Sequence, residues 1–91
     1  MENLETIKKE LNEGNVTVAI RKLDILIENS PPPSDELYYL RGNAYRKLGN
    51  WQMALNNYLE AIEHNPDSPA LQAKDMMMDI LNFYNKDMFN Q

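Results

Sequence analysis

The chain has 91 residues with nine basic and fourteen acidic side chains, so its formal net charge is −5. This acidic balance argues against general binding to nucleic acids or anionic membranes, because both need clustered positive charge. The chain contains no cysteine, which excludes disulfide bonds and thiolate metal sites.

The length fits one small domain. No apolar run approaches the ~20 residues needed to span a bilayer. The first residues, MENLETIKKE, lack the basic segment followed by an apolar run that marks a signal peptide. We therefore expect a single cytoplasmic domain over residues 1–91 without a membrane segment.

The first two predicted helices follow each other closely. Leu4, Ile7 and Leu11 show helical spacing, and this segment ends at Gly14-Asn15. The second segment places apolar residues on one face from Val16 to Ile27. It stops at 29–30, before three successive prolines, because proline excludes the helical region for the residue before it.

Three more helices are predicted further along the chain. The third runs from about Asp35 to Leu48, with Ser34 as N-cap and Gly49 as the stop signal. The fourth covers about 51–64, and the fifth opens at Ser68-Pro69. No segment alternates with a period of two, so the sequence predicts an all-α fold with five helices.

The sequence repeats itself with a shift of 35 residues. Six of the twenty positions from Gly14 to Pro33 are identical to their counterparts: Gly14/Gly49, Asn15/Asn50, Ala19/Ala54, Ile27/Ile62, Glu28/Glu63 and Pro31/Pro66. A helix-turn-helix unit that recurs at this period is typical of a helical solenoid. Such a unit cannot bury its apolar face alone, so its neighbours must stack on it.

Residues 35–68 resemble a tetratricopeptide repeat over their whole length. The family pattern is an aromatic residue, then L-G-x2-Y, A-x3-F and P. The residues at these positions here are Tyr38, Arg41, Gly42, Tyr45, Ala54, Tyr58 and Pro66, where Tyr38 replaces the usual tryptophan and Arg41 the usual leucine. The resemblance implies a solenoid of a degenerate first repeat (1–33), a second repeat (34–68) and a capping helix with tail (69–91). It also implies that Gly42 sits where two helices cross, and that Tyr38, Gly42, Tyr45 and Leu48 form a core stripe.

The resemblance implies a non-enzymatic module that binds a peptide or partner segment in a concave groove. The residues at groove positions are Lys9, Asn12, Tyr39, Asn43, Arg46, Lys47, Lys74 and Met78. Arg41, Arg46 and Lys47 lie in a stretch without acidic residues, from Leu37 to Leu59, which favours an acidic or carboxylate-bearing ligand. The alternative is that Arg46 and Lys47 only stabilise a helix end through its dipole.

The C-terminal segment is rich in apolar residues. The candidate interface residues there are Met76, Met77, Leu81, Phe83, Met88 and Phe89. These side chains could cap the array internally, with Met88 and Phe89 folded back on its end, or form a homodimer interface, or bind a partner. The homodimer is the competing hypothesis for function.

Catalysis finds little support in the sequence. His64 is the only histidine, and it falls in the last turn of a predicted helix, where a cation interacts well with the dipole. There is no phosphate-binding loop, no nucleophile with a recognisable base and no metal-ligand cluster. We therefore expect no enzyme activity, no cofactor and no metal.

Overall fold

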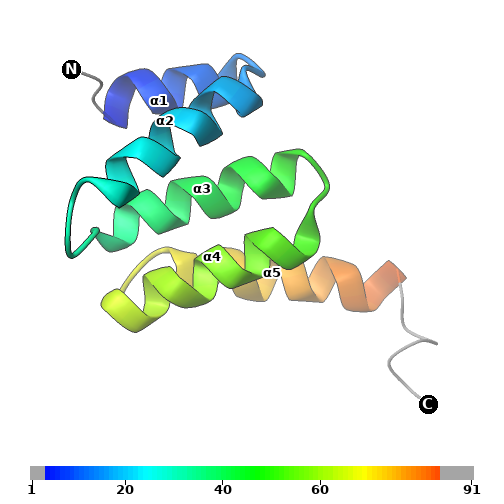
Figure 1. The fold of residues 1–91 in the computed structure, drawn as a ribbon. Coiled ribbons are helices and arrows are strands. Elements are labelled where there is room, and N and C mark those ends of the chain that lie inside the picture. The colour runs from blue at the N-terminus through cyan, green and yellow to red at the C-terminus, as the bar shows by residue number, and fades with distance from the viewer. Residues whose placement is uncertain (1–3, 85–91) are drawn as a thin grey trace.

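The computed structural model describes residues 4–84, and these residues form five helices without a strand (Figure 1). The helices are α1 (Leu4–Asn12), α2 (Val16–Glu28), α3 (Asp35–Lys47), α4 (Trp51–His64) and α5 (Ala70–Tyr84). The predicted all-α fold is confirmed, and the five helices lie over the five predicted segments.

Consecutive helices pack on each other along the chain, as in a solenoid. Helices α1 and α2 form one hairpin and α3 and α4 a second, while α5 packs on α4. Figure 1 shows the resulting stack, with α1 and α2 at one end, α3 in the middle, and α4 and α5 at the other end.

The two hairpin turns have the same backbone structure. Gly14 and Gly49 both take a positive φ, +87° and +77°, a conformation that favours glycine. The next residue in each turn donates its N–H five residues back, from Asn15 to the Glu10 carbonyl (2.8 Å) and from Asn50 to the Tyr45 carbonyl (2.9 Å). This is the hydrogen bond that closes a Schellman helix end. Both donors and both acceptors are 35 residues apart, so the internal repeat is present in the backbone.

Serine residues precede α3 and α5 as predicted. Ser34 occupies the N-cap position of α3, although its side chain makes no capping hydrogen bond. The Ser68 hydroxyl is buried and accepts a hydrogen bond from the Ala70 N–H at 3.1 Å. Ser68 therefore fixes the direction in which α5 starts.

The apolar core has two parts, which lie on either side of α3. The first joins α1, α2 and α3, and its fully buried members include Ile7, Ala19 and Leu23. The second joins α4 and α5 around Tyr58 and Met77. The half-buried tyrosines of α3, Tyr39 and Tyr45, pack against both parts.

The predicted core stripe of α3 needs a correction. Leu48 is 53% exposed, because α3 ends at Lys47 and Leu48 already belongs to the turn. Leu37, Leu40 and Ala44 are buried instead, and they belong to the first part of the core. A middle helix of a stack needs apolar residues on two faces, whereas the single predicted stripe supplies only one.

Gly42 lies at a close approach between α3 and α4. A β-carbon at this position would lie 2.7 Å from two ring carbons of Tyr58 and 3.3 Å from the Ala54 carbonyl oxygen. The Tyr58 side chain is fully buried, so its ring has little room to move aside. The close approach of the two helices therefore requires glycine here.

Replacing Gly42 with leucine should lower the free energy of unfolding by about 3 kcal/mol, because the added side chain forces α3 and α4 apart. Chemical denaturation followed by circular dichroism measures this change. Gly49→Asn is the control, since a β-carbon at Gly49 meets no atom within 4 Å and asparagine tolerates a positive φ. Equal losses in the two variants would contradict the close approach.

Candidate functional site

A hollow of about 400 Å³ lies between α1 and α3. It is lined by Lys8, Leu11, Asn12, Tyr39, Leu40, Asn43, Arg46 and Lys47. Leu11 and Leu40 are buried and belong to the core beneath it, whereas the polar residues form its walls. The hollow therefore combines an apolar floor with basic and amide side chains that can donate hydrogen bonds.

A second hollow of about 200 Å³ lies between α3 and α5. Its lining residues are Tyr39, Arg46, Pro69, Gln72, Ala73 and Met76. Tyr39 and Arg46 line both hollows, so these two side chains form the wall that the hollows share. We call the two hollows together the groove; the first, third and fifth helices contribute to it.

The cations of the groove differ in how they are paired. Lys8 forms ion pairs with Glu36 at 3.2 Å and Glu5 at 3.3 Å, and hydrogen bonds to these carboxylates, Glu36 foremost, raise its pKa. Among the described residues, no carboxylate lies within ion-pair distance of Arg46 or Lys47. The uncompensated positive charge of the groove therefore belongs to α3.

The Asn43 side chain is held by the core beneath the groove. The buried Tyr58 hydroxyl donates a hydrogen bond to the Asn43 carboxamide oxygen, so this contact joins α4 to α3. The amide nitrogen of the same side chain has no acceptor among residues 4–84. Asn43 can therefore offer a hydrogen-bond donor to a ligand in the groove.

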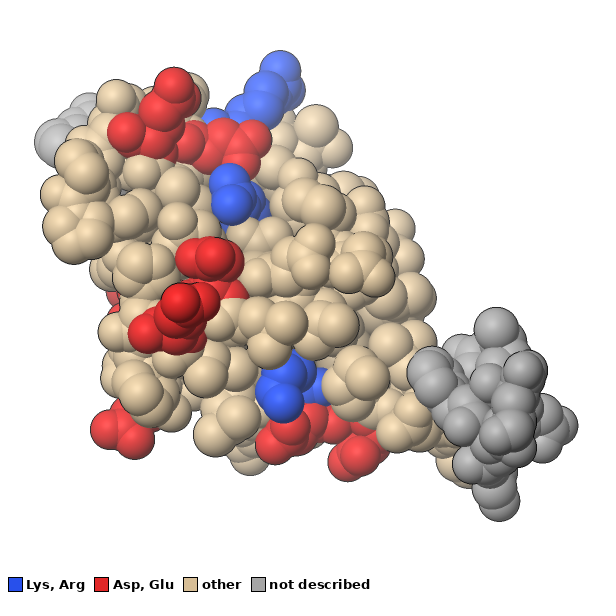
Figure 2. Space-filling view, turned by 60° about the horizontal axis from the view of Figure 1, so that its bottom comes forward, with Lys and Arg blue, Asp and Glu red and all other residues tan. Residues whose placement is uncertain are grey.

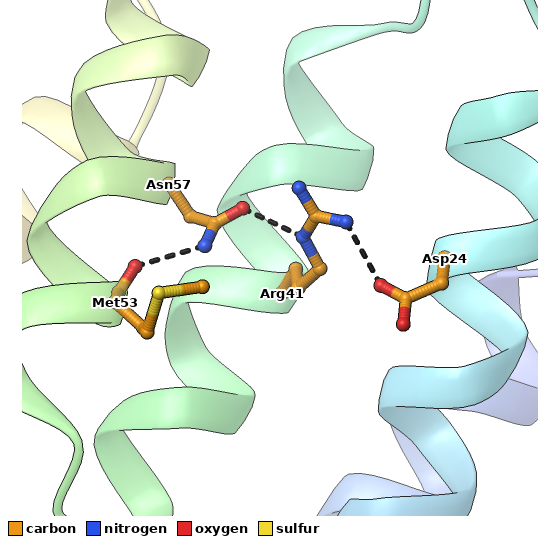
Figure 3. Close-up of polar contacts among 4 residues, drawn as sticks. All are labelled: Asp24, Arg41, Met53 and Asn57. Atoms are coloured by element: carbon orange, nitrogen blue, oxygen red, sulfur yellow. Dashed lines mark hydrogen bonds and ion pairs between the residues drawn. The ribbon is translucent and has the colours of Figure 1, made fainter.

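Arg41 lies outside the groove, although the sequence grouped it with the basic residues of α3. Its guanidinium bonds to Asp24 of α2 at 2.8 Å and to the side-chain oxygen of Asn57 of α4 at 2.7 Å (Figure 3). The buried Asn57 in turn donates to the Met53 carbonyl at 2.8 Å. Arg41 thus links the two hairpins, and its charge is already balanced by Asp24.

Comparison with known proteins agrees with this architecture. The sequence pattern described as "Tetratricopeptide repeat" matches residues 36–68. The solution NMR structure of protein BF1650 from Bacteroides fragilis is similar over all of this chain and 92% of that one, with 62% sequence identity and a TM-score of 0.88. The chain belongs to the tetratricopeptide repeat family. No curated protein matches it.

Tetratricopeptide repeats generally act as protein–protein interaction modules and are generally not enzymes. No group of three potential metal-binding side chains is found among residues 4–84, and none of the helices there is long and apolar enough to cross a membrane. His64 stacks on Tyr38, with ring centroids 5.3 Å apart, so this histidine packs at the end of the second repeat.

Most groove residues predicted on the first and third helices line the groove. Asn12, Tyr39, Asn43, Arg46 and Lys47 do so, whereas Lys9 is exposed outside both hollows. Lys8 takes the place expected for Lys9. The 35-residue shift relates Lys8, rather than Lys9, to Asn43, so the internal repeat indicates which lysine of the first helix lines the hollow.

Helix α5 is rotated relative to the prediction. Lys74 and Met78 do not line the groove; Lys74 pairs with Asp75 at 3.2 Å, and Met78 packs against the second part of the core. Gln72 and Met76 line the groove instead. Sequence reasoning did not assign these two residues to the groove.

The candidate interface residues are scattered over α5. Met77 is buried at 1% exposure, and Leu81 packs against the second part of the core. Met76 and Phe83 are 54% and 78% exposed, and Ile80 between them is 47% exposed. Met88 and Phe89 lie outside the described residues. A continuous apolar face is therefore limited to one stripe of Met76, Ile80 and Phe83.

The buried side chain of Tyr58 makes the domain less stable at alkaline pH. Burial, the largest effect, raises the pKa of Tyr58 above its ordinary value of 10.0, while the nearby Arg46 opposes this rise. The unfolded chain therefore loses the phenol proton at a lower pH than the folded chain. The contribution to stability is fully present below about pH 10 and is lost as the pH rises above it.

We expect the free energy of unfolding of Tyr58→Phe to fall less steeply above pH 10 than that of the unchanged protein, by up to ~1.4 kcal/mol per pH unit. At neutral pH the variant should be less stable by about 1 kcal/mol, because the hydrogen bond to Asn43 is lost. Denaturation curves at several pH values measure both effects. Parallel pH profiles would show that the buried phenol does not cause the alkaline loss.

Proposed function

We propose that the groove binds an extended acidic peptide segment of a partner protein. The observation that supports this proposal concerns Arg46. This side chain lines both hollows and has no carboxylate partner among the described residues. Guanidinium and carboxylate groups match each other in geometry and form strong charge-assisted hydrogen bonds. Arg46 is thus the centre of the proposed recognition.

Neighbouring side chains complete the proposed binding surface. Lys47 adds a second cation at the same end of α3, and the amide nitrogen of Asn43 adds a neutral donor. On the α5 side of the shared wall, Met76 supplies exposed apolar surface beside Arg46. A ligand with a carboxylate next to an apolar side chain would use both hollows.

The competing hypothesis is a homodimer formed through α5. Met76, Ile80 and Phe83 favour it, because they are exposed at helical spacing on one side of this helix. A stable interface usually buries about 800 Å² on each partner. Three side chains cover much less than this, and of the other proposed interface residues Met77 is buried and Leu81 packs against the second part of the core. The groove therefore has the stronger support.

Arg46→Glu should weaken binding of an acidic peptide by about tenfold or more, because a charge-assisted hydrogen bond contributes about 1.5–3 kcal/mol. Fluorescence anisotropy with a short Asp/Glu-rich peptide and its Asn/Gln counterpart measures the affinity. Arg21→Glu is the matched control, since Arg21 is exposed on α2 outside both hollows and gives the same change in charge. Equal affinities of the two variants would remove Arg46 from the site.

The molar mass in solution tests the homodimer. We expect a value near 10.6 kDa at all points of a tenfold concentration range, measured by light scattering. A mass that approaches twice this value as concentration rises would instead favour the α5 stripe as an interface.

A further inference from the structure

A cleft of about 230 Å³ lies between α4 and α5 and shares no residue with the groove. Its lining residues are Trp51, Gln52, Leu55, Met77, Met78 and Leu81. Five of these six side chains are apolar, and Met77 is buried at its base. We call this hollow the α4–α5 cleft. Trp51 at its rim is 39% exposed, which leaves a large apolar ring partly in contact with water.

The surface around the cleft carries little charge. Residues 48–59, which form the α3–α4 turn and most of α4, include no Asp, Glu, Lys or Arg. Figure 2 shows a broad uncharged area on the right of the view, whereas acidic and basic side chains lie on the left, at the top and along the lower edge. A ligand for this cleft must therefore be recognised by apolar contact rather than by charge.

The chain itself contains an apolar segment within reach of the cleft. Leu81 lines the cleft and lies one helical turn before the end of α5. Residues 85–91 follow, with the sequence NKDMFNQ, in which Met88 and Phe89 are adjacent. Phe89 comes five residues after Tyr84, and five extended residues span up to about 17 Å. Packed helices lie about 8–10 Å apart, so this length suffices to turn back across the cleft to Trp51.

We propose that the side chains of Met88 and Phe89 dock into the α4–α5 cleft of their own chain and cover Trp51. A methionine adapts its shape to irregular apolar surfaces, and its sulfur makes favourable contacts with aromatic rings. An aromatic pair between Phe89 and Trp51 adds to the apolar burial. Because the segment is tethered to α5, its effective concentration at the cleft is far higher than that of the same segment on another molecule.

This docking would complete the second repeat on the side away from the groove. The cleft walls come from α4 and α5, so the docked segment would hold the capping helix against the repeat. Docking of Met88 and Phe89 would be independent of peptide binding, because no residue of the cleft lines the groove. A failure of either proposal leaves the other standing.

Trp51 is the only tryptophan of the chain, so its fluorescence reports directly on the cleft. In the full-length chain, Met88→Ala combined with Phe89→Ala should raise the acrylamide quenching constant of Trp51 and shift its emission to longer wavelength. Asn85→Ala combined with Asn90→Ala is the matched control, since it changes two residues of the same segment and keeps both apolar side chains. This control should leave quenching and emission unchanged.

Two further measurements separate docking from unfolding and from association between chains. Far-UV circular dichroism must be the same for all three proteins, so that a change in quenching reports local exposure. A nuclear Overhauser effect between the Phe89 ring and the Trp51 indole, unchanged over a tenfold dilution, would support docking within one chain. The proposal is overturned if the Met88/Phe89 variant is quenched like the unchanged protein. It is also overturned if dilution alone exposes Trp51, because a second copy would then be the occupant.

Discussion

The close contact between α3 and α4 at Gly42 is the constraint on which the rest of the structure depends. Because this residue has no side chain, the ring of Tyr58 can lie directly against the α3 backbone. The ring then fills the centre of the second part of the core, and its hydroxyl reaches Asn43 one residue further along α3. A single missing β-carbon thus determines both how the hairpin closes and how a groove side chain is oriented. The same contact couples the stability of the repeat to the chemistry of its surface.

The middle position of α3 explains how so short a chain builds a core and a binding surface together. Leu40 and Ala44 face the first hairpin, while Tyr39 and Tyr45 reach both parts of the core. On the sides that remain, Arg41 links α2 to α4, and Arg46 stands between the two hollows of the groove. Residues five positions apart on a helix point about 140° away from each other. Two arginines of one helix can therefore serve different purposes, one structural and one exposed to a ligand.

Most of the fold could be predicted from the sequence, because helix ends and turns depend on local features. The glycines and asparagines of the two turns mark the same backbone structure in both repeats, and their spacing predicts the solenoid. The orientation of α5 depends on packing and could not be read in this way. Met76, Met77 and Met78 are equally apolar and follow one another at about 100° per residue, so they cover more than half of the helix circumference. Only the contacts with α4 show that the first of them borders the groove, the second is buried and the third borders the cleft.

The distribution of charge explains how an acidic chain can offer a positive site. Lys8 brings a positive charge to the groove, but Glu5 and Glu36 already balance it. Asp24 likewise balances Arg41 on the opposite side of α3. These acidic side chains therefore neutralise Lys8 and Arg41 and leave Arg46 unpaired among the described residues. The repulsion between the acidic side chains of the protein and a ligand carboxylate is screened beyond ~8–10 Å at physiological salt. A carboxylate that reaches the groove would interact mainly with the local field of Arg46, and the net charge of −5 would slow its approach more than it would weaken its contact.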